Sequence, residues 1–212
     1  MKFERIQFIT DNSNADELFS KVRSALIHGV RWIQYRNKTS ADDIKLIEAL
    51  QLKKICDEFS ATLIINDSIE LCMESRAHGV HLGKNDMKIS EARKILGNEF
   101  IIGGSTNSFE DVLQCVHEGA DYAGIGPFRF TATKNNLNPI LGRAGFEKIM
   151  TAYKERNLSL PLFAIGGVME SDVGFFINLG IYGVAVSSMI ASSNNISSSV
   201  KSLKEKFQTQ II

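Results

Sequence analysis

Polar and charged side chains gather where several apolar stretches of this sequence end. Gln34, Arg36 and Lys38 alternate along one such stretch, so on an extended strand their side chains point to the same side. Two cations at this position could hold a phosphate group. A salt bridge with Asp42 or Asp43 explains the pattern equally well, because a motif this short decides little alone.

An amide and two carboxylates follow the next two apolar stretches. Asn66 and Asp67 end one of them, and Asp86 follows the other. Carboxylates from neighbouring strand ends suit Mg²⁺, which prefers oxygen ligands and keeps waters and substrate phosphates. The alternative is that Asp67 only caps a helix beginning at Ser68. The second carboxylate, Asp86, favours the metal site.

Glycine and hydroxyl residues close the last two apolar stretches, as Gly166-Gly167 and Ser187-Ser188. Glycine lets the backbone approach an anion closely, and parallel barrels often bind phosphate at this place. Tight turns would produce the same residues. Thr131, Thr133 and Lys134 on the preceding loop favour phosphate. The chain is therefore expected to hold two anionic groups.

Histidine and cysteine offer little for nucleophilic chemistry. Of the four histidines only His81 falls in an expected strand, and we expect it to pack near Asp86 rather than transfer protons. The sequence offers no obvious His/Asp or Cys/His pair for nucleophilic catalysis. The reaction should therefore rely on charge stabilisation and positioning.

The elements that must position these residues are short strands alternating with helices. The strands are mostly apolar without strict alternation, which is typical of parallel strands buried on both faces. They are expected at 6–10, 32–37, 62–67, 79–83, 100–105, 122–127, 162–166 and 183–187. The alternation predicts an α/β protein, a single (β/α)8 TIM barrel domain over 1–212, with an open doubly wound sheet as the weaker alternative.

Two helical patterns predict which side chains face inward. A capping box near Ser40 should open a helix that turns Ile44, Ile47, Ile55 and Phe59 inward. The last helix should bury one apolar stripe, made of Ile196, Val200, Leu203 and Phe207.

Composition excludes several classes of partner. Lys plus Arg equals Asp plus Glu, at 24 each, so no basic excess points to nucleic acid or an anionic membrane. The uncharged stretch 173–200 is interrupted by Gly, Asn and Ser and should form helix, turn, buried strand and loop. Cys56, Cys72 and Cys115 lack metal or redox spacing. Without an apolar signal segment at the start, we expect a soluble, cytoplasmic protein with buried reduced thiols.

Six motifs in this chain resemble those of thiamine-phosphate synthases and occur in the same order. They are Gln34-x-Arg36-x-Lys38, Ile64-Ile65-Asn66-Asp67, Gly79-Val80-His81-Leu82-Gly83-x-x-Asp86, Gly103-x-Ser105, Gly126-Pro127-x-x-x-Thr131-x-Thr133-Lys134 and Ala164-Ile165-Gly166-Gly167. The resemblance implies an Mg²⁺-dependent transferase. It would join 4-amino-2-methyl-5-(diphosphooxymethyl)pyrimidine to a thiazole phosphate by a dissociative substitution, releasing pyrophosphate.

The resemblance also implies a role for each matched position. Six residues would contact the pyrimidine diphosphate or the departing pyrophosphate: Gln34, Arg36, Lys38, Asn66, Ser105 and Lys134. Four of these six would be catalytic, namely Arg36, Lys38, Ser105 and Lys134. The thiazole phosphate would contact Thr131, Thr133, Gly167, Val186 and Ser187, and Mg²⁺ would lie on Asp67 and Asp86. One departure is Phe128-Arg129-Phe130 where relatives commonly carry Ile-Phe-Pro, and it leaves Arg129 without a role.

Two other functions fit the same fold. A thiazole tautomerase would need a proton-shuttling residue, and a noncatalytic thiazole phosphate-binding barrel would not need paired aspartates. The intact aspartate pair and Thr-x-Thr-Lys motif favour the synthase. The expected partners are small-molecule substrates, with no nucleic acid or membrane, and a homo-oligomer is compatible with the sequence.

Overall fold

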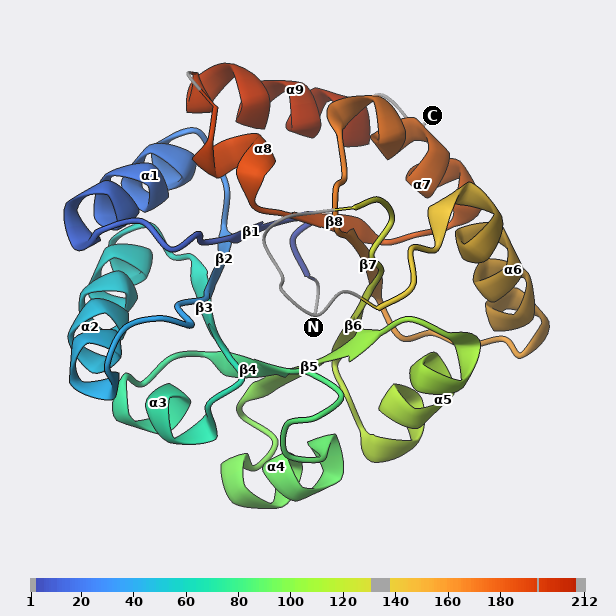
Figure 1. Cartoon of the computed structure of the whole chain (residues 1–212), viewed down its shortest axis with the longest axis horizontal. Coiled ribbons are helices and arrows are strands. Elements are labelled where there is room, and N and C mark those ends of the chain that lie inside the picture. Colours follow the sequence, from blue (N-terminus) through green and yellow to red (C-terminus); the bar gives the residue numbers. More distant parts are fainter. Residues whose placement is uncertain (1–2, 131–137, 194, 209–212) are drawn as a thin grey trace.

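Eight parallel strands close into a barrel inside a ring of helices (Figure 1). The computed structural model describes residues 3–130, 138–193 and 195–208. The strands are β1 (Ile6–Ile9), β2 (Trp32–Tyr35), β3 (Thr62–Asn66), β4 (Gly79–Leu82), β5 (Ile101–Thr106), β6 (Tyr122–Ile125), β7 (Leu162–Ile165) and β8 (Gly183–Val186). They are hydrogen-bonded in sequence order, and β8 pairs with β1. The predicted (β/α)8 barrel is confirmed, and the open sheet is wrong.

Helices connect consecutive strands and cover the outside of the barrel. They are α1 (Ala15–Ile27), α2 (Asp42–Glu58), α3 (Ile69–Glu74), α4 (Ile89–Leu96), α5 (Phe109–Glu118), α6 (Gly142–Glu155), the 3₁₀ turn η1 (Glu170–Asp172) with α7 (Val173–Leu179), α8 (Ser188–Ala191) and α9 (Ile196–Gln208). The helix and the buried strand predicted within 173–200 are confirmed, but α8 and the start of α9 occupy most of the segment that was expected to be a loop. None of the helices in the described ranges is long and apolar enough to span a bilayer.

Several strands end earlier than expected. β2 ends at Tyr35 instead of residue 37, and β3 ends at Asn66, so Arg36, Lys38 and Asp67 lie just beyond the hydrogen-bonded ladder. Their side chains are therefore carried by short loops at the carboxyl end of the barrel, where barrel enzymes place their chemistry.

Aromatic side chains fill the opposite end of the barrel interior. Trp32 begins β2 and packs edge-on against Tyr122 at 4.8 Å and Phe163 at 4.9 Å between ring centroids. All three rings are almost fully buried. Because they come from the first half of their strands, they close the barrel from below and leave its carboxyl end open for a ligand.

The inward face of α2 differs from the prediction. Ile55 is fully buried, but Ile44 is 43% and Ile47 is 62% exposed. The buried face is centred on Leu52, and at 100° per residue Ile47 lies about 140° away from that centre. The expected capping box is also wrong, because the residue before the helix is Ala41, whose side chain makes no capping hydrogen bond.

The last helix and the cysteines follow the sequence predictions. Val200, Leu203 and Phe207 of α9 are buried, and Ile196 packs against the same core. The three cysteines are free and buried. Burial raises the pKa of the Cys56 thiol to about 12, so this thiol stays protonated and packs as an apolar group.

Candidate active site

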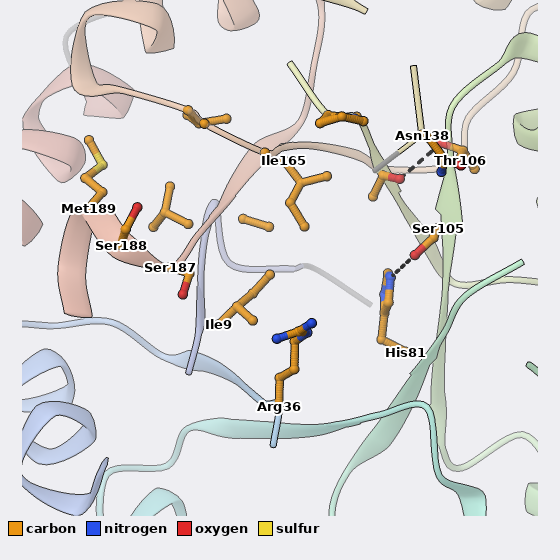
Figure 2. Close-up of a pocket in the computed structure, with 18 residues that line it drawn as sticks. Ile9, Arg36, His81, Ser105, Thr106, Asn138, Ile165, Ser187, Ser188 and Met189 are labelled. Atoms are coloured by element: carbon orange, nitrogen blue, oxygen red, sulfur yellow. Dashed lines mark hydrogen bonds between the residues drawn. The ribbon is translucent and has the colours of Figure 1, made fainter. Parts of the chain in front are cut away.

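A pocket with a cavity volume of about 120 Å³ opens at the carboxyl ends of the strands (Figure 2). Arg36 rises into it after β2, His81 and Ser105 face each other from β4 and β5, and Ser187 lies after β8. Its lining also includes Ile9, Thr106, Gly124, Gly126, Pro127, Asn138, Ile165, Gly166, Gly167, Val168, Ala185, Val186, Ser188 and Met189.

Gln34 and Asn66 are brought together from adjacent strands. The Gln34 amide Nε2 donates to Asn66 Oδ1 over 2.8 Å, and Gln34 is only 3% exposed. Its other amide atom, Oε1, is buried and has no hydrogen-bond partner among the described residues. A buried acceptor without a partner costs free energy that an N–H donor would recover.

Lys38 meets Asp67 across the ends of β2 and β3. Lys38 Nζ lies 2.8 Å from Asp67 Oδ2, while Asp42 pairs with Lys45. The alternative of a rim salt bridge with Asp42 or Asp43 is therefore wrong. The alternative that Asp67 caps a helix is wrong too, because Ser68 is the cap of α3 and its Oγ accepts from Leu71 N over 3.1 Å.

Asp67 and Asp86 form a neighbouring pair of carboxylates. Burial and then the charge of Asp67 raise the pKa of Asp86, while the Gly83 N–H, 2.6 Å from Asp86 Oδ2, opposes the shift. The backbone of Asp67 has a φ of +69°, a strained conformation that aspartate tolerates better than most residues. The two carboxylates could share a cation, and Lys38 Nζ supplies positive charge beside Asp67 in this structure.

The donor set around this pair fits magnesium. The described residues contain no cluster of three or more His, Cys, Asp or Glu side chains, so a metal there would have few protein ligands. Mg²⁺ is commonly held by one or two carboxylates together with waters and substrate phosphates. Asp67 and Asp86 supply this number of carboxylates, and the amide oxygen of Asn66 is already used by Gln34.

Arg36 carries positive charge into the pocket. Its guanidinium is half-buried, and burial lowers its pKa while Asp67 opposes the shift. The Arg36 N–H donates to Thr10 Oγ1 over 2.9 Å, which fixes the start of the loop after β2. Lys38 instead lines an adjoining cleft with Asn66 and Asp67, so the alternating residues reach neighbouring spaces rather than one.

His81 belongs to a buried hydrogen-bond chain that the sequence did not reveal. Gln7 Nε2 donates to the Tyr122 hydroxyl over 3.3 Å, and this hydroxyl lies 3.0 Å from His81 Nδ1. His81 Nε2 lies 3.0 Å from Ser105 Oγ. Since Gln7 donates to the phenol oxygen, the Tyr122 hydroxyl can donate its one proton to Nδ1, and in that tautomer His81 donates from Nε2 to Ser105.

The consequence of this chain is a Ser105 hydroxyl whose proton can point toward a ligand. Ser105 lines both the pocket and the cleft that contains Asp86. We expected His81 to pack near Asp86, but its hydrogen-bonding partners include Tyr122 and Ser105. A histidine inside an apolar strand was the available signal, and only the partners from β5 and β6 give it a role.

The loops after β7 and β8 form the other side of the pocket. Gly166 and Gly167 have φ values of +85° and +65°, which glycine adopts without strain. Val186 and Ser187 line the pocket beside them. Ser187 Oγ is buried and lacks a hydrogen-bond partner within the described ranges. Thr131, Thr133 and Lys134 lie outside the described residues, so their roles stay predictions.

Comparison with known proteins identifies the family. The family model described as Thiamine monophosphate synthase matches residues 6–190. The chain is 42% identical to a thiamine-phosphate synthase from Flavobacterium psychrophilum, covering 96% of this chain and 99% of the relative. It is 46% identical to the Bacteroides thetaiotaomicron enzyme, covering 87% and 88%.

A solved structure agrees in fold over nearly the full length. The thiamine phosphate pyrophosphorylase from Pyrococcus furiosus superimposes with a TM-score of 0.83 at 26% identity, covering 98% of this chain and 97% of that one. Together with the sequence relatives, this match shows that the chain belongs to the thiamine monophosphate synthase family.

Proposed function

We propose that this chain is a thiamine-phosphate synthase that joins 4-amino-2-methyl-5-(diphosphooxymethyl)pyrimidine to thiazole phosphate and releases pyrophosphate. The proposal is supported most by two groups of polar residues that lie in two regions on opposite sides of the barrel mouth. Lys38, Asp67 and Asp86 lie after β2, β3 and β4, whereas Gly167 and Ser187 lie after β7 and β8. In a closed barrel of eight strands, β3 and β7 are diametrically opposed.

The first region suits the pyrimidine diphosphate. Gln34 Oε1 can accept from the pyrimidine amino group, and Asn66 holds the Gln34 amide in place. Arg36 and Lys38 supply positive charge for the diphosphate, and Ser105 offers a hydroxyl proton. These groups stabilise the charge that develops on pyrophosphate as its bond to the methylene carbon breaks.

Asp67 and Asp86 are the residues that would hold Mg²⁺. When bound, the ion supplies Lewis-acid stabilisation of the leaving pyrophosphate. Asp67 also pairs with Lys38 in this structure, which keeps the lysine at the rim beside the region proposed for the diphosphate.

The second region suits thiazole phosphate. The Gly166-Gly167 turn allows close backbone approach, and Ser187 Oγ is a buried hydroxyl ready to bond a phosphate oxygen. The thiazole nitrogen forms the new C–N bond with its lone pair, so no proton has to be removed from it. This chemistry explains a site built from charges and hydrogen-bond donors.

A tautomerase remains the alternative with a specific observation in its favour. His81 lines the pocket and could in principle carry a proton, although its ring nitrogens face Tyr122 and Ser105. A tautomerase would interconvert thiazole isomers without any pyrimidine. The synthase requires both substrates, so the two functions separate in one assay.

The test is incubation of the purified protein with both substrates and Mg²⁺, with detection of thiamine phosphate and pyrophosphate. We expect both products in equal amounts, no product without the pyrimidine, and loss of turnover in EDTA. Absence of thiamine phosphate would refute the synthase, and isomerisation of thiazole phosphate alone would establish the tautomerase. Product formation that persists in EDTA would refute the magnesium assignment.

The buried free thiols support a reducing compartment. Cys56, Cys72 and Cys115 are unpaired and packed in the core. Reduced cysteines are the rule in the cytoplasm. We therefore infer a cytoplasmic location, which fractionation of the producing cells would check.

A further inference from the structure

Arg129 reaches from the end of β6 to the loop that follows β7. Its guanidinium binds both carboxylate oxygens of Asp172, with Nη2 2.7 Å from Oδ1 and Nη1 in contact with Oδ2. The Asp172 side chain is only 3% exposed, and its carboxylate also accepts from Met169 N over 2.8 Å. A bidentate pair of this kind fixes the plane of the guanidinium as well as its position.

The same arginine holds both carbonyl groups of the Gly166-Gly167 turn. Arg129 N donates to Gly166 O over 2.9 Å, and Nη1 donates to Gly167 O over 3.1 Å. These two peptide units are trans, since the cis bond of the described chain is Gly126–Pro127. In a planar trans peptide the N–H points opposite to the C=O. The N–H groups of Gly167 and Val168 therefore point away from Arg129.

The two sides of the turn thus have different neighbours. Gly166, Gly167 and Val168 line the pocket, and Arg129 is absent from the described lining. A Cβ at Gly167 would lie 2.8 Å from Arg129 Cβ, so the arginine packs directly against this residue. Arg129 holds the outer side of the turn, and the pocket side is left with successive N–H donors.

Two consecutive glycines do not keep this conformation unaided. Both have positive φ, and glycine populates many other conformations at little cost. Successive N–H groups directed to one side form a concave anion site. Its affinity depends on how well the donors are fixed before the ligand arrives.

We propose that Arg129 is a positioning residue that presets the N–H donors of Gly167 and Val168 for the phosphate of the thiazole substrate. The identity of that substrate rests on the proposed function. The arrangement of the donors rests only on the contacts of Arg129. Asp172 serves by holding the guanidinium, and neither side chain needs to touch the ligand.

The test compares Arg129→Ala, Arg129→Lys and Asp172→Asn with the wild type. Arg129→Ala keeps the backbone bond to Gly166 and loses the bonds to Gly167 and Asp172. We expect KM for thiazole phosphate to rise about 10- to 100-fold, as for other small misplacements of binding groups. KM for the pyrimidine diphosphate should change less than about twofold, which a general loss of structure would not produce.

The other two variants distinguish positioning from charge. Arg129→Lys keeps the positive charge but cannot form the bidentate pair with Asp172. Compared with Arg129→Ala, it should therefore restore only part of the affinity for thiazole phosphate. Asp172→Asn should reproduce the direction of the Arg129→Ala effect, and the double variant should be less than additive because one pair is broken in both. Arg23→Ala is the matched control, since it removes an exposed bidentate pair with Glu58 on α1 and α2. It should leave both KM values unchanged.

Calorimetric titration of folded wild type and Arg129→Ala with thiazole phosphate, and with inorganic phosphate, separates this inference from the synthase assignment. Loss of phosphate binding in the variant would support the inference even if no thiamine phosphate were formed. Unchanged binding and unchanged KM would overturn it while leaving the synthase intact. Equal losses for both substrates in Arg129→Ala and Asp172→Asn would also overturn it, because they would indicate a structural role.

Discussion

Replacing Ser187 by alanine should stabilise the unliganded protein and weaken its binding of phosphate. The hydroxyl is buried and has no hydrogen-bond partner in the described part of the chain. An unsatisfied buried polar group costs about 1–3 kcal/mol, so its removal should raise the free energy of unfolding by about 1 kcal/mol. For a chain of this length the melting temperature should rise by roughly 2–4 °C.

The same substitution removes a donor to the charged phosphate. A hydrogen bond to a charged group contributes about 1.5–3 kcal/mol. This loss corresponds to a rise of roughly 10- to 150-fold in KM for thiazole phosphate. KM for the pyrimidine diphosphate should stay unchanged, because the structure puts Ser187 at β8, across the barrel from β4.

The assay is thermal unfolding of the unliganded proteins, together with steady-state kinetics in which each substrate is varied. Ser75→Ala is the matched control, because Ser75 is 1% exposed and its Oγ donates to Leu71 O over 2.6 Å. That variant should lose stability and keep both KM values. A fall in melting temperature for Ser187→Ala, or an unchanged KM for thiazole phosphate, would refute the reasoning.

Three further perturbations test other parts of the site and its support. Asp67→Ala and Asp86→Ala should each abolish magnesium-dependent turnover while the circular dichroism spectrum persists, and near-normal rates in EDTA would contradict the metal assignment. Lys38→Ala should lower kcat more than it raises KM for the pyrimidine diphosphate, because leaving-group charge grows in the transition state; an effect on KM alone would limit the lysine to substrate capture. Glu48→Ala should lower the free energy of unfolding in urea by about 2–3 kcal/mol, since it leaves the buried Tyr35 hydroxyl without its acceptor, and an unchanged midpoint would contradict this.

The sequence was informative wherever the signal is local. Short apolar strands alternating with helical patterns predict a barrel, because burial on both faces removes the polar alternation of a half-exposed strand. The polar residues at the ends of those strands also predict where the functional residues lie, since parallel strands present their carboxyl ends at the same end of the barrel. Gln34, Asn66 and Asp67 were predicted as site residues from their positions in this pattern, and Ser105 from the resemblance to the family.

The sequence pattern predicted less well which face of a helix packs against the barrel and where each strand ends. Ile44 and Ile47 are apolar and helical, yet both are exposed because the barrel contacts another face of α2. Periodicity shows that a helix has an apolar side, but it does not show which residues of that side reach the core. Strand ends were likewise misjudged by one or two residues, as in β2.

Only the tertiary structure decided the partners of the functional groups. Gln34 meets Asn66 across 32 positions of sequence, His81 meets Ser105 across 24, and Arg129 meets Asp172 across 43. Sequence determined which residue types stand at the rim, because that depends on local runs of apolar and polar residues. Pairing depends on closure of the barrel, which brings together loops distant in sequence, and so the role of Arg129 became readable only in three dimensions.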